Sequence, residues 1–118
     1  MKKNIVKEKS FKFAIRTVRL YKYLIFKKEY IISKQLLRSG TSIGALIREA
    51  EQAESRSDFI HKLSIALKEA NEADYWLELL FKTAYLSSKE YQTIMYDCRE
   101  LIKLLTSIIK HSKIRKGG

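Results

Sequence analysis

Apolar residues recur at helical spacing along most of the chain, and four amphipathic segments can be distinguished. They cover about residues 10–28, 32–53, 57–84 and 87–112, with short polar joints between them. Because short joints between long helices make neighbouring helices antiparallel, the pattern predicts an all-α fold. We expect one antiparallel up-down-up-down four-helix bundle, a single domain over residues 1–118.

The third segment has the most regular pattern. Its apolar seam alternates spacings of four and three residues: Phe59, Leu63, Ala66, Ala70, Ala73, Leu77, Leu80 and Ala84. A seam over more than three heptads is typical of a helix packed in a bundle. Ser57 is the expected N-cap, with Asp58 at the positive end of the helix dipole. The fourth segment opens with the capping box Ser87-Ser88-Lys89-Glu90.

The first segment combines an apolar stripe with a basic face. The stripe consists of Phe11, Ala14, Ile15, Val18, Tyr21 and Ile25, is widened by Phe13, Leu20 and Leu24, and is expected to face the core. Lys12, Arg16 and Arg19 follow one another at i, i+4 and i+7, so they share a different face.

The second segment contains the most unusual feature, Gly40-x-x-x-Gly44, within an inner stripe. Each glycine inside a helix costs about 1 kcal/mol relative to alanine, so a compensating gain is expected. The favoured explanation is close approach of a neighbouring helix, and the alternative is backbone left open for a ligand or phosphate. A helix break between Ser39 and Ser42 is a further alternative.

The charge of the chain is large and uneven. The formal net charge is +11, and residues 1–48 carry 13 Lys and Arg against two acidic residues, whereas residues 49–98 carry 5 against 10. This balance favours a polyanion as partner over a merely soluble lysine-rich surface. The topology also predicts a basic pole where the two ends of the chain meet, unless both ends are frayed. That pole would combine Lys2, Lys3, Lys7, Lys9 and Lys12 with Lys110, Lys113, Arg115 and Lys116.

Phosphate contacts are assigned to cations of the first two segments: Lys12, Arg16, Arg19, Lys34 and Arg38. Arginine and tyrosine interleave between Arg16 and Tyr23, a pattern that can hold phosphate and stack on an unpaired base. Tyr23 is the candidate for exposure, whereas Tyr21 falls on the apolar stripe. Trp76, one position off its seam, is interpreted as core rim or subunit contact.

The residues that catalysis requires do not converge in this sequence. A di-iron bundle needs inward Glu-x-x-His pairs, but His61 points away from the seam of its helix. Cys98 lies on a seam, where a buried inert thiol is expected, and a single cysteine fits a reducing compartment. We therefore predict a protein without enzyme activity, metal site or cofactor. With no signal peptide or spanning segment recognised, it is expected in the cytoplasm and not in a membrane.

Specific runs of sequence resemble a known family. The run from Ser33 to Ala45, then Arg48-Glu49-Ala50 and Tyr75-Trp76-Leu77, resembles the bacterial four-helix-bundle proteins first noticed in intervening sequences of 23S ribosomal RNA genes. This resemblance, over about residues 10–105, implies a homopentamer. It also implies kinship with the accessory variability protein of diversity-generating retroelements, a basic pentamer that binds nucleic acid and a reverse transcriptase. Leu46 departs from the family's usual asparagine, so no site is transferred there.

Two functions follow from these observations. The first is a homo-oligomer that binds nucleic acid, RNA in first place, through phosphate contacts. The alternative is a structural or adaptor oligomer with a protein partner and no nucleic-acid role. In that case the basic face of the first segment would contact Glu69, Glu72 and Glu78 of the next subunit.

Overall fold

The computed structural model consists of four helices and contains no strand within residues 2–117, which are the residues that the structure describes; side chains are described for residues 5–114. The helices are α1 (Lys2–Phe26), α2 (Ile32–Glu51), α3 (Arg56–Lys82) and α4 (Ser88–Gly117). The predicted all-α four-helix fold is confirmed. The outer bounds were underestimated, because α1 begins eight residues before the expected Ser10 and α4 continues past residue 112.

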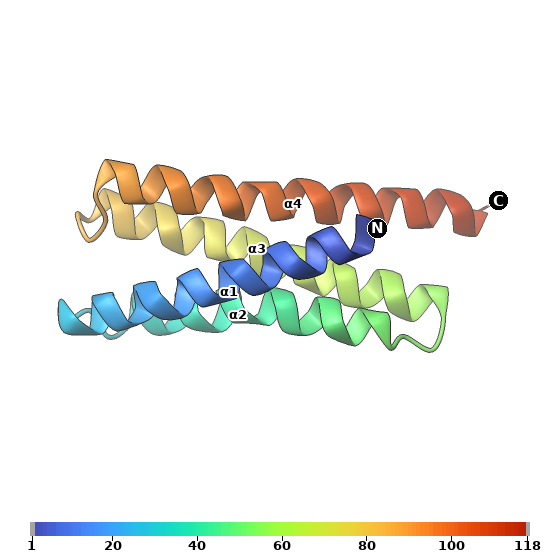
Figure 1. Cartoon of the computed structure of the whole chain (residues 1–118), viewed down its shortest axis with the longest axis horizontal. Coiled ribbons are helices and arrows are strands. Elements are labelled where there is room, and N and C mark those ends of the chain that lie inside the picture. The colour runs from blue at the N-terminus through green and yellow to red at the C-terminus, as the bar shows by residue number, and fades with distance from the viewer. Residues whose placement is uncertain (1, 118) are drawn as a thin grey trace.

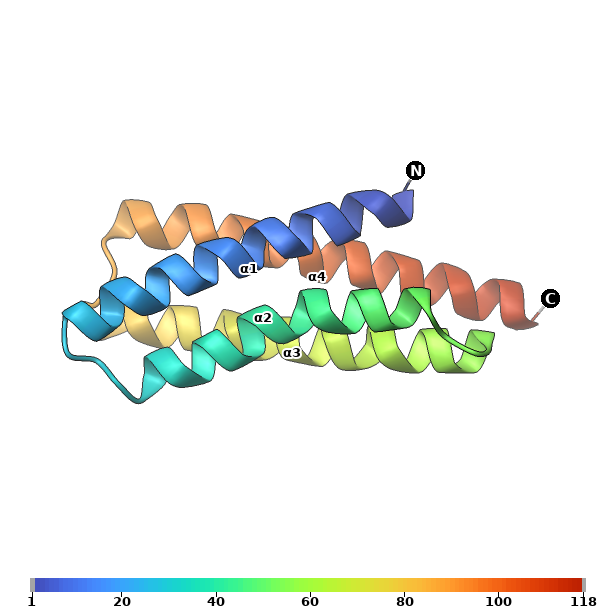
Figure 2. The same ribbon diagram turned by 60° about the horizontal axis from the view of Figure 1, so that its bottom comes forward.

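The helices run alternately up and down the long axis of the bundle (Figure 1). α1 packs against α2 and α4, and α3 packs against the same two helices from the opposite corner. Both ends of the chain lie at one end of the bundle, and the α1–α2 and α3–α4 turns lie at the other (Figure 2). The rod measures 50 × 22 × 21 Å.

The seam of α3 forms the centre of the core. Six of its eight predicted positions, from Leu63 to Leu80, are buried. Alanine at three of them lets neighbouring helices approach closely, which suits the narrow rod. The two ends of the seam differ from prediction: Phe59 is only half-buried beside a buried Ile60, and Ala84 lies beyond α3 with a left-handed φ of 69°.

α1 buries one edge of the predicted stripe, with Phe13 and Leu24, rather than its centre. The buried positions are Val6, Ser10, Phe13, Thr17 and Leu24, whereas Phe11 is 52% exposed and Val18 36% exposed. The serine and threonine hydroxyls donate to carbonyl oxygens of their own helix, Ser10 to Lys7 at 2.9 Å and Thr17 to Phe13 at 2.8 Å. Both hydroxyl groups therefore keep a hydrogen bond when they are buried. Because Ser10 and Thr17 are polar, the apolar periodicity of the sequence did not place them on the core face.

The two glycines of α2 face α1. A Cβ on Gly40 would lie 2.7 Å from both Cγ2 and Oγ1 of Thr17, whereas one on Gly44 would lie 3.4 Å from Oγ of Ser10. Close helix approach therefore explains Gly40. The alternative of a break between Ser39 and Ser42 is wrong, because α2 is continuous there. Hydroxyl groups in this stretch donate back to carbonyls of the same helix, which keeps a Ser- and Thr-rich segment helical.

A capping box opens α4, and a serine N-cap opens α3. The hydroxyl of Ser87 accepts from the Glu90 N–H, and the Glu90 carboxylate accepts from the Ser87 N–H, both at 3.1 Å, as predicted. The cap of α3 is Ser55 rather than Ser57: the Ser55 hydroxyl accepts from the Asp58 N–H at 3.0 Å. The Asp58 carboxylate also accepts from the N–H of Glu54, the residue before Ser55, at 3.3 Å. This second hydrogen bond favours Ser55 over Ser57 as the cap.

Candidate nucleic-acid interface

The five cations assigned to phosphate contacts do not form one surface. Arg16 on α1 reaches α4, where its guanidinium lies 2.7 Å from the carboxylate of Asp97 and 2.9 Å from the Thr93 hydroxyl. Arg38 on α2 reaches α3 on the other side of the molecule, where it pairs with Glu69 at 3.3 Å and with Glu72. The α1 and α2 cations therefore flank different grooves.

Three of these five cations form ion pairs within the chain, which makes them less available to an external phosphate. Arg16 and Arg38 each hold at least one carboxylate, and Lys12 pairs with Glu8 at 3.6 Å. The Lys12 pair is more than 70% exposed on both sides, so it contributes little stability and leaves the lysine available. Glu69 and Glu72 are already paired with Arg38 of the same chain. They are therefore less available for the expected contact with the basic face of α1 in a neighbouring subunit.

The last two turns of α1, the α1–α2 turn and the start of α2 carry cations that have no acidic partner among the described side chains. We call this group the basic end: Arg19, Lys22, Lys27, Lys28 and Lys34. All five are exposed. Residues 9–48 contain a single acidic residue, Glu29, so the nearby sequence supplies almost no negative charge to oppose them.

Glu29 is itself withdrawn from the surface, with 8% of the residue exposed. Its carboxylate accepts backbone N–H groups at the start of α2, from Ile31 at 3.2 Å, Ile32 at 3.1 Å and Ser33 at 2.6 Å. Desolvation alone would raise the pKa of Glu29, but the hydrogen bonds from these N–H groups outweigh it and hold the pKa below its usual range. The one carboxylate of the segment thus caps a helix instead of neutralising the basic end.

Replacing Glu29 with glutamine should lower the free energy of unfolding at pH 7 by about 1–2 kcal/mol, since charge-assisted hydrogen bonds to three N–H groups are weakened. The folded-state pKa lies below the unfolded one, so this contribution is complete above the unfolded pKa and disappears as the pH falls through the folded pKa. Urea denaturation from pH 7 to pH 3 should show the two proteins converging. Glu78→Gln, on an exposed residue of α3, is the control; a constant difference across the range would contradict the cap.

Exposed aromatic and aliphatic side chains accompany the basic end. Phe26 is 82% exposed, Tyr30 53%, Ile31 75% and Tyr23 39%. The ammonium of Lys27 lies 5.8 Å from the centre of the Tyr23 ring. The prediction that Tyr23 is exposed is confirmed, and Tyr21 is half-buried.

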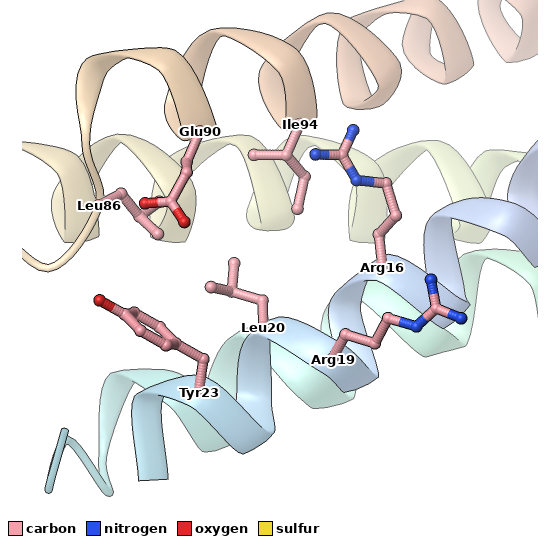
Figure 3. A pocket seen from close by; sticks show the side chains of 7 residues that line it. All are labelled: Arg16, Arg19, Leu20, Tyr23, Leu86, Glu90 and Ile94. Atoms are coloured by element: carbon pink, nitrogen blue, oxygen red, sulfur yellow. The ribbon is translucent and has the colours of Figure 1, made fainter. Parts of the chain in front are cut away.

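A groove between α1 and α4 adjoins these residues (Figure 3). It encloses about 300 Å³ and is lined by Arg16, Arg19, Leu20, Tyr23, Leu86, Glu90 and Ile94. Tyr23 and Leu20 rise from α1 toward Ile94 and Glu90 on α4, with Leu86 at one end. The groove therefore has an aromatic wall, an aliphatic lining and cations along one side.

Part of the predicted basic pole at the chain ends is paired with acidic residues from elsewhere in the chain, whereas Lys110 and Lys113 are exposed and have no acidic partner among the described side chains. The α2–α3 turn lies at that same end of the bundle (Figure 2). Lys7 pairs with Glu51 at 3.0 Å, and Lys9 pairs with Glu100 at 3.2 Å. Side chains of four other members of the predicted pole, Lys2, Lys3, Arg115 and Lys116, lie outside the described residues.

Reactive groups do not cluster in the part of the molecule whose side chains are described. No group of three His, Cys, Asp or Glu residues there is placed to hold a metal ion, and His61 is exposed as predicted. Cys98 is fully buried, and its thiol donates to the Ala70 carbonyl at 3.4 Å. Burial first, and then the nearby Asp74, raise the pKa of Cys98 to about 12, so the thiol is not ionised at neutral pH.

Trp76 and Leu46 both pack partly buried against the core. The Trp76 ring meets the exposed Tyr75 edge-on, with 4.9 Å between ring centres, and its Nε1 is enclosed without a hydrogen-bond partner. Trp76 thus occupies the core rim, one of the two positions predicted for it. Among the residues described, no helix combines the length and apolarity needed to cross a membrane.

Comparisons with known proteins agree with the fold. The model of the 23S rRNA-intervening sequence protein family matches residues 2–107. A crystal structure of a protein with unknown function from the S23 ribosomal protein family of Bacteroides thetaiotaomicron is 63% identical and superposes with a TM-score of 0.92. The match covers 93% of this chain and 99% of that one. No curated protein matches the chain.

Proposed function

This chain belongs to the 23S rRNA-intervening sequence protein family, and on that premise we propose that it is a non-catalytic, cytoplasmic homo-oligomer that binds nucleic acid, RNA in first place, through phosphate contacts. The pentamer implied by the family resemblance is the proposed assembly. The observation that carries the binding proposal is the basic end, where five exposed cations have no acidic partner among side chains 5–114 and Glu29 is used as a helix cap. Arg19 and Lys34 are the predicted contacts that belong to it.

Replacing Arg19, Lys27 and Lys34 together with glutamate should weaken binding of single-stranded RNA at least about tenfold at low salt and flatten its salt dependence. The physical reason is the loss of up to three phosphate contacts and of the counterions they release. Fluorescence anisotropy at several salt concentrations measures both effects.

The matched control is Lys68, Lys103 and Lys110 replaced with glutamate, which changes the net charge equally but elsewhere on α3 and α4. All three lysines are exposed and take part in no ion pair within the described side chains. If the control weakens binding as much as the triple variant, the basic end is not the binding surface.

The outer side of α1 supports the proposed assembly. Phe11 and Val18 are exposed there beside the half-buried Ile15. An apolar stripe on the solvent side of a bundle helix is typical of a subunit contact. Arg48 lies over the Phe11 ring at 5.1 Å, which supplies a cation at the edge of the stripe.

The variant Val18→Asp should therefore convert the assembly to a monomer of 13.9 kDa, measured by light scattering at micromolar concentration. A buried aspartate in a subunit contact carries a desolvation penalty that an exposed one avoids. Asn71→Asp, on an exposed position of α3, introduces the same charge and should leave the assembly intact. A wild-type protein that is already monomeric would refute the assembly.

A structural or adaptor oligomer with a protein partner is the second candidate function. The observation in its favour is that Arg16 and Arg38 are already neutralised within the chain, while the apolar stripe of α1 is open. An assembled wild-type protein that does not bind RNA at low salt would select this function over the first.

A further inference from the structure

A ridge of alternating cations and rings runs along one side of α1. Arg19, Tyr23 and Phe26 are spaced i, i+4 and i+7, which places them on neighbouring positions of one helix face, and Lys22 lies at the edge of this face, beside Ile15 and Val18 of the outer apolar stripe. All four are exposed, and Phe26 is 82% exposed. A single exposed ring on a protein surface is ordinary, but here the rings alternate with cations that no acidic side chain in the described part of the molecule pairs with.

The ridge borders the groove between α1 and α4 (Figure 3). The Tyr23 ring stands beside this groove, Leu20 and Ile94 form its apolar lining, and Arg19 lies further along the same side. A volume of about 300 Å³ corresponds to the lower end of the range of small-molecule pockets. The space therefore suits one flat group of the size of a nucleobase rather than an extended ligand.

Glu90 determines which part of a nucleotide can enter. Its carboxylate lies on the α4 side of the groove, opposite Tyr23, where one oxygen accepts the Ser87 N–H of the capping box and the other is left to face a ligand. A phosphate inside the groove would be repelled by this carboxylate and would meet apolar side chains, whereas a base would contact a ring face and present its amino groups to an acceptor. The cations that suit phosphates lie along the rim instead, at Arg19 and at Lys27, whose ammonium lies over one face of the Tyr23 ring and leaves the other face for a base.

We propose that the ridge and groove bind single-stranded nucleic acid, with an unpaired base stacked on Tyr23 and the flanking phosphates at Arg19 and Lys27. This inference rests on the proposed function and adds its substrate class. The rings of Tyr23 and Phe26 stack only on bases whose faces are free, and in a duplex those faces are covered by neighbouring base pairs. A single strand is therefore bound in preference to a duplex of the same sequence.

Anisotropy measurements with a labelled RNA of about 12 nucleotides, single-stranded or annealed to its complement, test the inference. The wild type should bind the single strand about tenfold more tightly than the duplex. The double variant Tyr23→Leu, Phe26→Leu should lose about tenfold on the single strand and less than about twofold on the duplex. Tyr96→Leu, which removes a 69% exposed ring from α4, should change neither affinity.

The outcomes distinguish base stacking on the ridge from RNA binding by the basic end. Equal binding of single strand and duplex, unaffected by the double variant but weakened by the charge-reversed triple variant, overturns the inference and leaves the proposed function standing. Absence of binding to either RNA overturns both. Vesicles containing phosphatidylserine provide a third arm: if the double variant loses vesicle binding and keeps full RNA affinity, the rings serve a membrane surface and the inference fails.

Discussion

Replacing Phe13 with alanine is expected to lower the free energy of unfolding by about 3–5 kcal/mol, the range measured when a fully buried phenylalanine is truncated. Phe13 is 1% exposed and lies between Ser10 and Thr17 on the face of α1 that the core covers. The loss combines the hydrophobic contribution of the ring with the cavity left in a tightly packed interior. Thermal or urea denaturation followed by far-ultraviolet circular dichroism measures it.

Phe26→Ala is the matched control, because it removes the same ring from the same helix at a position that is 82% exposed. Its effect on unfolding should stay within about 0.5 kcal/mol. A cost at Phe13 no larger than at Phe26 would mean that α1 buries a different face, and the assignment of the ridge and the outer apolar stripe would then be wrong.

Replacing Gly40 with leucine is expected to cost about 3 kcal/mol or more, or to prevent folding. Even a single methyl group there would approach Thr17 to 2.7 Å, and Thr17 is a buried β-branched residue with little freedom to move. Overpacking in a close-packed core usually costs about 1–3 kcal/mol for a few added methylenes, and leucine adds four carbons where the first already collides. α1 and α2 would have to separate along their contact.

Ala45→Leu supplies the comparison, since Ala45 is exposed on the same helix and close in helix propensity to leucine. This variant should unfold within about 0.5 kcal/mol of the wild type. Gly44→Ala is expected to be neutral or stabilising, because its Cβ would make an ordinary contact with Ser10 at 3.4 Å while the helix gains propensity. Equal destabilisation by Gly40→Leu and Ala45→Leu would refute close packing as the reason for Gly40.

The parts of the fold that could be predicted from sequence are those encoded within one helix. The six central positions of the α3 seam and the capping box from Ser87 to Glu90 depend on residues three or four positions apart, and both were placed correctly. The buried face of α1 was not, because its polar members Ser10 and Thr17 satisfy their hydroxyls locally and behave as small core residues. A rule that tolerates serine and threonine on a packing face would have placed Phe13 and Leu24 at the centre of the stripe and Phe11 outside it.

The candidate interface was only partly predictable, because the charge of a side chain depends on partners far along the chain. Arg16 and its partner Asp97 are 81 residues apart, and Arg38 reaches Glu69 across the α2–α3 contact. The number of cations in α1 and α2 was visible in the sequence, but which of them remain without a partner depended on the packing. The withdrawal of Glu29 into the start of α2 likewise follows from three backbone contacts around a turn.

The salt dependence of RNA binding by the wild-type protein tests the central claim most directly. If the basic end neutralises three to five phosphates of a single strand, log K against log salt concentration should be linear with a slope of about −2 to −3.5. Affinity would then fall about 20- to 130-fold between 50 and 200 mM salt. An affinity that stays constant over this range, or no binding at the lowest salt, would contradict the account.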